Sequence, residues 1–127
     1  MTTLLSFGHG FSAKALPPLL TGRGWRVIGT TRSADKADAV RASGAEPLIW
    51  PGGDLAPALA GATHLLISAG PGPDGDPVLN AARDDIAAVA PTIQWAGYLS
   101  TTGVYGDHQG GWVEETTPLA PSTRRGA

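Results

Sequence analysis

The stretch that decides the fold is TLLSFGHGFSAKAL, residues 3–16. Its apolar start, residues 3–7, stands directly before Gly8 and Gly10, and Ala13 follows three residues after the second glycine. In a strand, turn and helix, Gly8 permits the tight turn and Gly10 lets a pyrophosphate approach the backbone. Ala13 then lets the helix pack close to the sheet. The pattern predicts a dinucleotide-binding turn; a glycine-rich bend without a ligand is the alternative.

The residues around these glycines refine the prediction. Phe11 and Ser12 begin the expected helix, whose unpaired N–H groups and partial positive charge favour phosphate, so both are candidate cofactor-binding residues. His9 occupies the variable position, where we expect its backbone to contribute rather than its side chain to act as a base. Pro17 and Pro18 predict a kink or an early stop of the helix, and a segment that is mostly loop is the alternative.

The rest of the chain alternates short apolar runs with helix-like segments. Ser33 is placed to cap a helix that Gly44 ends, and a helical turn and a longer helix are expected at 54–61 and within 77–90. Because the apolar runs are nearly continuous, they indicate an α/β fold, a Rossmann-type doubly wound parallel sheet of strand order 3-2-1-4-5. The four strands expected after residues 3–7 are 25–30, 46–50, 64–68 and 95–100.

Length, charge and composition exclude several classes of protein. A chain of 127 residues suits one domain, and its net charge of −2 argues against a nucleic-acid-binding surface. There is no cysteine, and the three histidines show no metal-ligand spacing, so no metal site is expected. Neither a signal peptide nor a membrane span is evident, and we expect a cytoplasmic protein.

The end of the second expected strand selects the cofactor. An NAD-binding chain usually carries Asp or Glu about 20 residues after the glycines, where it holds the ribose 2′-hydroxyl. Here Thr30 and Thr31 are neutral and are followed by Arg32 and Ser33, which suit a 2′-phosphate. NADP is therefore the predicted cofactor, with NAD possible. The alternative is an ordinary solvated arginine beside a helix cap.

Two further motifs lie near the end of the chain, TTGVYG at 101–106 and ETTP, a Glu-x-x-Pro segment, at 115–118. In these motifs the chain from residue 98 onward resembles the extended short-chain dehydrogenase/reductase superfamily, which includes NAD(P)-dependent epimerases, dehydratases and their atypical relatives. The glycine turn, Arg32 and the pair at 54–55 precede them in the same order as in the family. Together these motifs span nearly the whole chain.

The resemblance implies roles for further residues. Asp54 and the backbone of Leu55 would contact the adenine, and Thr101 would hydrogen-bond a substrate oxygen as the candidate catalytic residue. A threonine that caps a backbone group is the alternative for Thr101, and Tyr105 is expected to be a packing residue. The loop beneath the cofactor would consist of Ser68, Ala69 and Gly70.

One departure from the family concerns proton transfer. The family's acid/base tyrosine, which three residues separate from a lysine, would stand about where this chain has Arg125-Gly126. Arginine cannot exchange a proton near neutral pH. We therefore expect residues 1–100 to be the NAD(P)-binding domain, and 101–127 to begin an active-site segment without its downstream catalytic helix and substrate domain.

Three functions remain open. The first is the NAD(P)-binding domain of an oxidoreductase or nucleotide-sugar epimerase/dehydratase acting on a small carbonyl or sugar-like substrate. The second is a non-catalytic NADP-sensing or partner-binding module, and the third is a domain for another adenine-containing ligand. In each case the last strand, 95–100, would form an exposed sheet edge through which copies of the chain could associate.

Overall fold

Five parallel strands form one sheet in the order β3-β2-β1-β4-β5 in the computed structural model, which describes residues 1–127. All four neighbouring pairs are parallel, which confirms the predicted α/β class and strand order. Because β1 lies between β2 and β4, the turn that follows it opens where the strand order reverses. The strands are β1 Thr3–Phe7, β2 Arg26–Thr31, β3 Glu46–Ile49, β4 His64–Ile67 and β5 Trp95–Tyr98.

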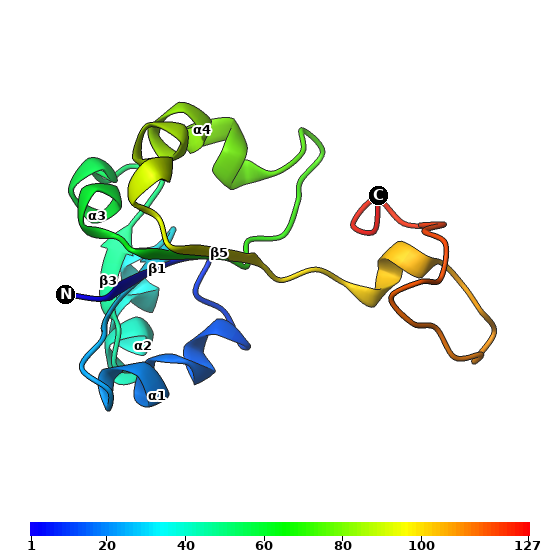
Figure 1. The fold of residues 1–127 in the computed structure, drawn as a ribbon, viewed down its shortest axis with the longest axis horizontal. Coiled ribbons are helices and arrows are strands. Elements are labelled where there is room, and N and C mark those ends of the chain that lie inside the picture. Colours follow the sequence, from blue (N-terminus) through cyan, green and yellow to red (C-terminus); the bar gives the residue numbers. More distant parts are fainter.

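Helices cover both faces of this sheet (Figure 1). One layer holds α1, Pro17–Thr21, and α2, Ala37–Ala42, and the other holds α3, Ala56–Gly61, and α4, Pro77–Val89. The longest helical segment, α4, has 13 residues with a kink at Ala82, and no helix combines the length and apolar character that a membrane crossing requires. Single 3-10 turns complete the element list: η1 Ala13–Ala15, η2 Ala34–Lys36, η3 Ala90–Thr92 and η4 Thr102–Tyr105.

The interruption expected at Pro17 and Pro18 is present. The 3-10 turn η1 ends at Ala15, and α1 begins anew at Pro17, so both prolines occupy the first helical positions. A missing N–H costs nothing there, because the first N–H groups of a helix have no partner within it. The segment is thus two short helical pieces rather than one helix or a loop.

The predicted boundaries of the second helical segment are also confirmed. The Ser33 side chain accepts a hydrogen bond from the Asp35 N–H, 3.2 Å away, at the start of η2. Gly44, at φ +95°, follows the end of α2, and its N–H donates to the Arg41 carbonyl oxygen at 2.9 Å. This glycine-terminated helix end aims β3 back along the sheet.

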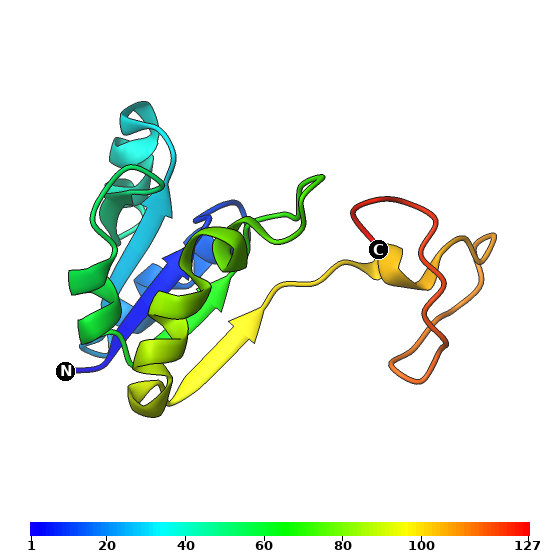
Figure 2. The same ribbon diagram turned by 90° about the horizontal axis from the view of Figure 1, so that it is seen from above.

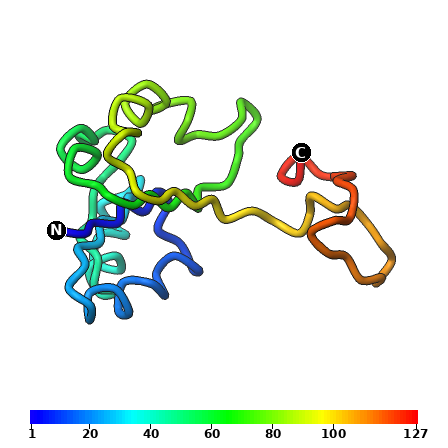
Figure 3. Tube along the Cα trace, viewed as in Figure 1, coloured from blue at the N-terminus to red at the C-terminus, as the bar shows by residue number.

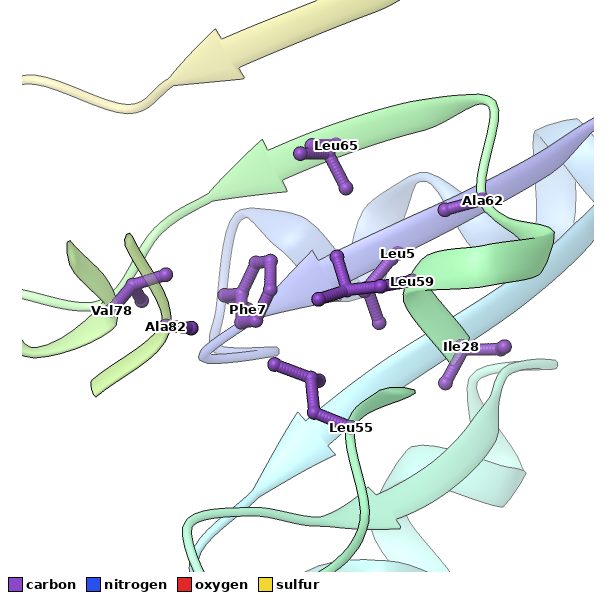
Figure 4. Close-up of a cluster of buried hydrophobic side chains, with 9 residues drawn as sticks. All are labelled: Leu5, Phe7, Ile28, Leu55, Leu59, Ala62, Leu65, Val78 and Ala82. Carbon is purple, nitrogen blue, oxygen red and sulfur yellow. The ribbon is translucent and has the colours of Figure 1, made fainter. Parts of the chain in front are cut away.

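Two apolar layers hold the sheet between the helices. The layer beneath α3 and α4 centres on the side chains in Figure 4, which come from β1, β2, β4, both helices and the two residues that flank α3. All five residues of β1 are buried, as expected for a central strand covered on both faces. The first layer contains Leu5, Phe7, Ile28, Leu55, Leu59, Ala62, Leu65, Val78 and Ala82, and the opposite layer contains Leu4, Ala13, Val27, Val40, Ala45 and Leu66.

Residues beyond β5 leave the sheet and form a separate loop region around η4 (Figures 2 and 3). This region is held to itself by backbone hydrogen bonds, such as that from the Ala120 N–H to the Val104 carbonyl oxygen, 2.9 Å long. β5 is an edge strand, and its Trp95 and Tyr98 are 50% and 49% exposed. The sheet therefore presents an unpaired edge next to this loop region.

Replacing the residue that caps α4 should destabilise the domain. The Asp76 carboxylate accepts hydrogen bonds from the N–H groups of Val78 and Leu79, at 2.8 and 3.0 Å. We expect Asp76→Ala to lower the free energy of unfolding by about 1 kcal/mol, as measured by urea denaturation. Asp84→Ala is the control, because Asp84 is exposed on the same helix and its side chain makes no hydrogen bond. Equal losses of unfolding free energy in the two variants would show that the capping hydrogen bonds of Asp76 do not stabilise the domain.

Candidate functional site

A pocket lies where the carboxyl ends of four parallel strands meet. Its walls come from the residues that end or follow β1, β2, β3 and β4, and from the start of α4. This is the edge at which open α/β sheets bind ligands. The lining residues are Gly8, Thr30, Thr31, Arg32, Trp50, Pro51, Ala69, Pro77 and Val78.

The turn after β1 is fixed by contacts on both sides. Gly8 has φ +72°, and its N–H donates to Thr30 Oγ1 at 2.9 Å. On the other side, a Cβ atom at position 8 would lie 2.9 Å from the Ala69 backbone nitrogen. Ser68 Oγ lies 2.7 Å from the Gly8 carbonyl oxygen and 3.0 Å from that of Phe7, so its proton ties β4 to the turn. Glycine is required here by conformation and by space.

The other predicted residues of the glycine motif lie outside the lining of this pocket. The Gly10 N–H donates to the Gly8 carbonyl oxygen at 2.7 Å, and a Cβ at Gly10 would meet only that oxygen, at 3.7 Å. Phe11 is 86% exposed, and Ser12 precedes η1 without a side-chain capping bond. Ala13 is 2% exposed and belongs to the core layer, so it packs closely against the sheet.

His9 points away from the pocket and joins three elements. Its ring nitrogens lie 3.3 Å from Ser6 Oγ and 3.0 Å from Ser43 Oγ, and the ring covers the Cα of Gly29, where a Cβ would be 2.8 Å from it. Burial lowers the pKa of His9 below its ordinary value of 6.5. The side chain is therefore a neutral structural group between β1, β2 and α2.

Arg32 is an unpaired cation on the rim of the pocket. It is exposed, lines the pocket, and makes no ion pair or side-chain hydrogen bond within the protein. The neighbouring Ser33 uses its oxygen to accept the Asp35 N–H, which leaves its hydroxyl proton free. No carboxylate lines the pocket. The local field therefore favours an anion beside the end of β2.

The residues expected at the adenine lie elsewhere. The Leu55 side chain is 6% exposed and part of the core. Asp54 Oδ1 accepts the Ala56 N–H at 3.0 Å, and Asp54 lines a separate hollow with residues of β2 and β3. Gly70 is exposed and not part of the pocket lining, whereas Ala69 is. An adenine contact through Asp54 or the Leu55 backbone stays a prediction.

Trp50 is a wall of the pocket that the sequence reasoning did not single out. It follows β3, lines the pocket, and packs edge-on against Phe7, with ring centroids 5.4 Å apart at 67°. A large aromatic residue before Pro51 at the carboxyl end of a predicted strand was the available signal. The role of Thr30 in holding the turn was also not predicted, because its hydrogen bond to Gly8 joins residues that are 22 positions apart.

Thr101 lies in a second hollow, between the end of β5 and the chain's last residues. Its Oγ1 accepts the Gly103 N–H at 3.2 Å, so it caps a backbone group, the alternative considered for it. The hydroxyl proton is not used by that bond. Arg125 lines the same hollow. The lining residues are Tyr98, Leu99, Ser100, Thr101, Val104, Arg125, Gly126 and Ala127.

Comparison with known proteins extends this picture. No protein-family model matches the chain. Protein YeeZ of Escherichia coli strain K12 is 35% identical over 94% of this chain, which spans 47% of YeeZ. The solved structure of a functionally unknown conserved protein from Silicibacter pomeroyi is 60% identical, with a TM-score of 0.91, over 99% of this chain and 45% of that one. The chain thus spans about half the length of these relatives.

More distant solved structures share the fold. The UDP-glucose 4-epimerase of Bifidobacterium longum, solved in complex with NAD⁺ and UDP, has a TM-score of 0.67 at 19% identity over 98% of this chain and 44% of its own. Other structures of this fold are a short-chain dehydrogenase/reductase superfamily protein and an NAD-dependent epimerase/dehydratase. At the level of the fold, the resemblance to the extended short-chain dehydrogenase/reductases is confirmed.

A side chain at position 8 should destabilise the protein. Gly8→Ala places a Cβ in the left-handed region and against Ala69, so we expect the free energy of unfolding to fall by about 1–3 kcal/mol. Gly61→Ala, in α3, is the matched control, since a Cβ there has nothing within 4 Å. Chemical denaturation compares the two variants with the parent. A Gly8→Ala protein as stable as the parent would contradict the close contact.

His9 should make stability depend on pH. Because burial lowers its folded-state pKa below 6.5, the unfolded chain binds more protons as the pH falls through 6.5. Stability should therefore fall from that pH downward and level off below the folded-state pKa. In His9→Gln this contribution to the pH dependence should vanish. The free energies of unfolding measured at about pH 7.5 and about pH 5 should therefore differ less than in the parent.

His108→Gln, at an exposed histidine of the loop region, is the control and should retain the parent's pH dependence. An unchanged dependence in His9→Gln would mean that the His9 ring is not protected from protonation.

Proposed function

We propose that this chain is the NADP(H)-binding part of an oxidoreductase or epimerase/dehydratase of the extended short-chain dehydrogenase/reductase superfamily. One observation carries the proposal: the unpaired guanidinium of Arg32 shares a pocket with the Gly8 turn at the point where the strand order reverses. That point is the usual dinucleotide site of this fold.

The shape of the turn supports a bound pyrophosphate. Gly10 has no side chain, and the space that a Cβ would take beside it is open except for the Gly8 carbonyl oxygen. A phosphate can therefore approach the chain at Gly10, next to the N–H groups of Phe11 and Ser12, which make no hydrogen bond within the protein. Phe11 and Ser12 are exposed next to this turn and remain candidate contacts. A ligand at this turn would lie against the pocket of Gly8 and Ala69.

The charge of the pocket supports NADP over NAD. NAD-binding sites use a carboxylate to hold the ribose 2′-hydroxyl, and no carboxylate lines this pocket. Arg32 can bind the 2′-phosphate with charge-assisted hydrogen bonds, and the free hydroxyl proton of Ser33 can add one more. Trp50 gives the adenine an apolar wall. Adenine contacts through Asp54 and Leu55, and the Ser68–Gly70 loop beneath the cofactor, belong to this proposal.

The chemistry proposed for the loop region is orientation of a substrate oxygen. When bound, NADP(H) would supply or receive a hydride at a carbonyl carbon. Thr101 keeps its hydroxyl proton free while its oxygen accepts the Gly103 N–H, so it can donate to a carbonyl oxygen of a small carbonyl or sugar-like substrate. The hydroxyl is too weak an acid to deliver that proton near neutral pH.

A non-catalytic NADP-binding module is the second candidate. The observation in its favour is that Arg125, which cannot exchange a proton near neutral pH, lines the hollow of Thr101. Substrate-dependent loss of NADPH absorbance, abolished in Thr101→Val, would favour the enzyme. Cofactor binding without turnover of any aldehyde, ketone or nucleotide-sugar intermediate would favour the module. In either case, association of copies through the edge strand β5 is part of the proposal.

Arg32→Ala should separate the two cofactors. Losing a charge-assisted hydrogen bond of about 1.5–3 kcal/mol should weaken NADP binding about ten- to a hundredfold. NAD lacks the 2′-phosphate and should bind almost unchanged. Calorimetric titration of both cofactors measures the difference. Arg23→Ala is the control, because Arg23 is exposed, lies before β2 and does not line the pocket.

Equal losses for NADP and NAD in Arg32→Ala would show that Arg32 does not read the 2′-phosphate. Tight binding of ADP to the parent protein with no binding of either dinucleotide would instead favour a domain for another adenine-containing ligand.

A further inference from the structure

The side chains that line the hollow of Thr101 include several hydrogen-bond donors. Tyr98, Ser100 and Thr101 carry hydroxyl groups, Arg125 carries a guanidinium, and no carboxylate side chain lines the hollow. These side chains come from two parts of the chain, the end of β5 with the residues after it and a return segment 24 residues beyond Thr101. The cation and the hydroxyls thus meet only in the folded protein.

Arg125 is held beside Thr101 by its neighbours in the chain. Gly126 is buried, and a Cβ there would lie 2.6 Å from the Gly103 carbonyl oxygen, so only glycine lets the two backbones approach. The Gly126 N–H donates to Thr123 Oγ1 at 3.2 Å, and the Ala127 N–H donates to the Thr123 carbonyl oxygen at 3.0 Å. These contacts fix the backbone on the far side of Arg125.

The guanidinium itself has no partner in the protein. The ion pairs present are Arg26–Glu46 and Arg41–Asp38, and Arg125 donates no side-chain hydrogen bond. A guanidinium offers parallel N–H groups that match the two oxygens of a carboxylate or a phosphate. A hydroxyl can donate to the same group. The hollow therefore has the hydrogen-bond donors for an oxyanion.

We propose that this hollow binds an oxyanion, a carboxylate or a phosphate group, through Arg125 and Thr101. The inference rests on the proposed function, which it deepens: the substrate presented to Thr101 is an anionic carbonyl compound, with Arg125 binding its charged group. Arg125 then acts as a specificity-determining residue where the related dehydrogenases have a proton donor. It holds the charged end of the substrate and takes no part in proton transfer.

The test is a titration of the full chain with two probe anions, malonate and inorganic phosphate, followed through the backbone amide resonances of Gly103 and Gly126. Malonamide is the neutral counterpart of malonate. In the parent protein we expect saturable shifts with at least one anion and none with malonamide. Arg125→Gln should weaken that binding about ten- to a hundredfold. Arg125→Lys keeps the charge but lacks the paired N–H groups. Its affinity for the anion should therefore lie between those of the parent and Arg125→Gln.

Arg124→Gln is the matched control, because it removes the same charge one residue away and Arg124 does not line the hollow. Binding of malonate alone points to carboxylate substrates, and binding of phosphate alone to phosphorylated ones. The inference is overturned if neither anion binds the parent, or if Arg124→Gln weakens binding as much as Arg125→Gln. Amide resonances of Gly106 and Gly111, which lie in the same loop region but do not line the hollow, verify that each variant keeps this fold when they stay at their parental positions.

Binding of NADP, measured separately, distinguishes the two proposals. NADP binding without an anion site overturns the inference alone. An Arg125-dependent anion site without NADP binding overturns the proposed function alone.

Discussion

The close approach of Gly8 to the Ala69 backbone is the constraint on which the rest of the site depends. A Cβ at position 8 would meet the Ala69 nitrogen at 2.9 Å, so the loops after β1 and β4 can meet only if residue 8 is glycine. Two hydroxyls secure the contact, Thr30 from β2 and Ser68 from the end of β4. One turn thereby joins three strands at the edge where a ligand would bind. Arg32 lies beside this turn because it directly follows β2, and Thr30 of β2 accepts the Gly8 N–H.

Much of the fold could be predicted from local sequence. The apolar runs, the capping Ser33 and the terminating Gly44 are short-range signals with direct physical causes, and the structure has all of them. The strand order followed from crossover handedness, which depends on chain connectivity rather than on particular residues. The ends of strands shifted by one or two residues, as expected where apolar runs continue past the last ladder bond.

The side-chain contacts of the site were less accessible to sequence reasoning. The contact of Trp50 with Phe7 and the bond of Gly8 to Thr30 join different strands, and no local pattern encodes which side chains will meet there. Asp54, which was expected to contact a ligand, instead makes a local hydrogen bond: its carboxylate accepts the Ala56 N–H. Polar residues at loop ends can satisfy their own backbone or face a ligand, and composition does not separate these uses.

The position of β1 between β2 and β4 also has a consequence for how the chain acquires its structure. Leu5 pairs with Ile28 on one side and with Leu65 on the other, so the central strand needs a partner that is synthesised 60 residues later. Closing such a long loop costs entropy before any contact is gained, which makes parallel sheets slow to form. On the ribosome, the first strand and its glycine turn must wait until β4 has emerged. Until then, a strand whose five residues are all buried in the folded protein stays accessible to other molecules.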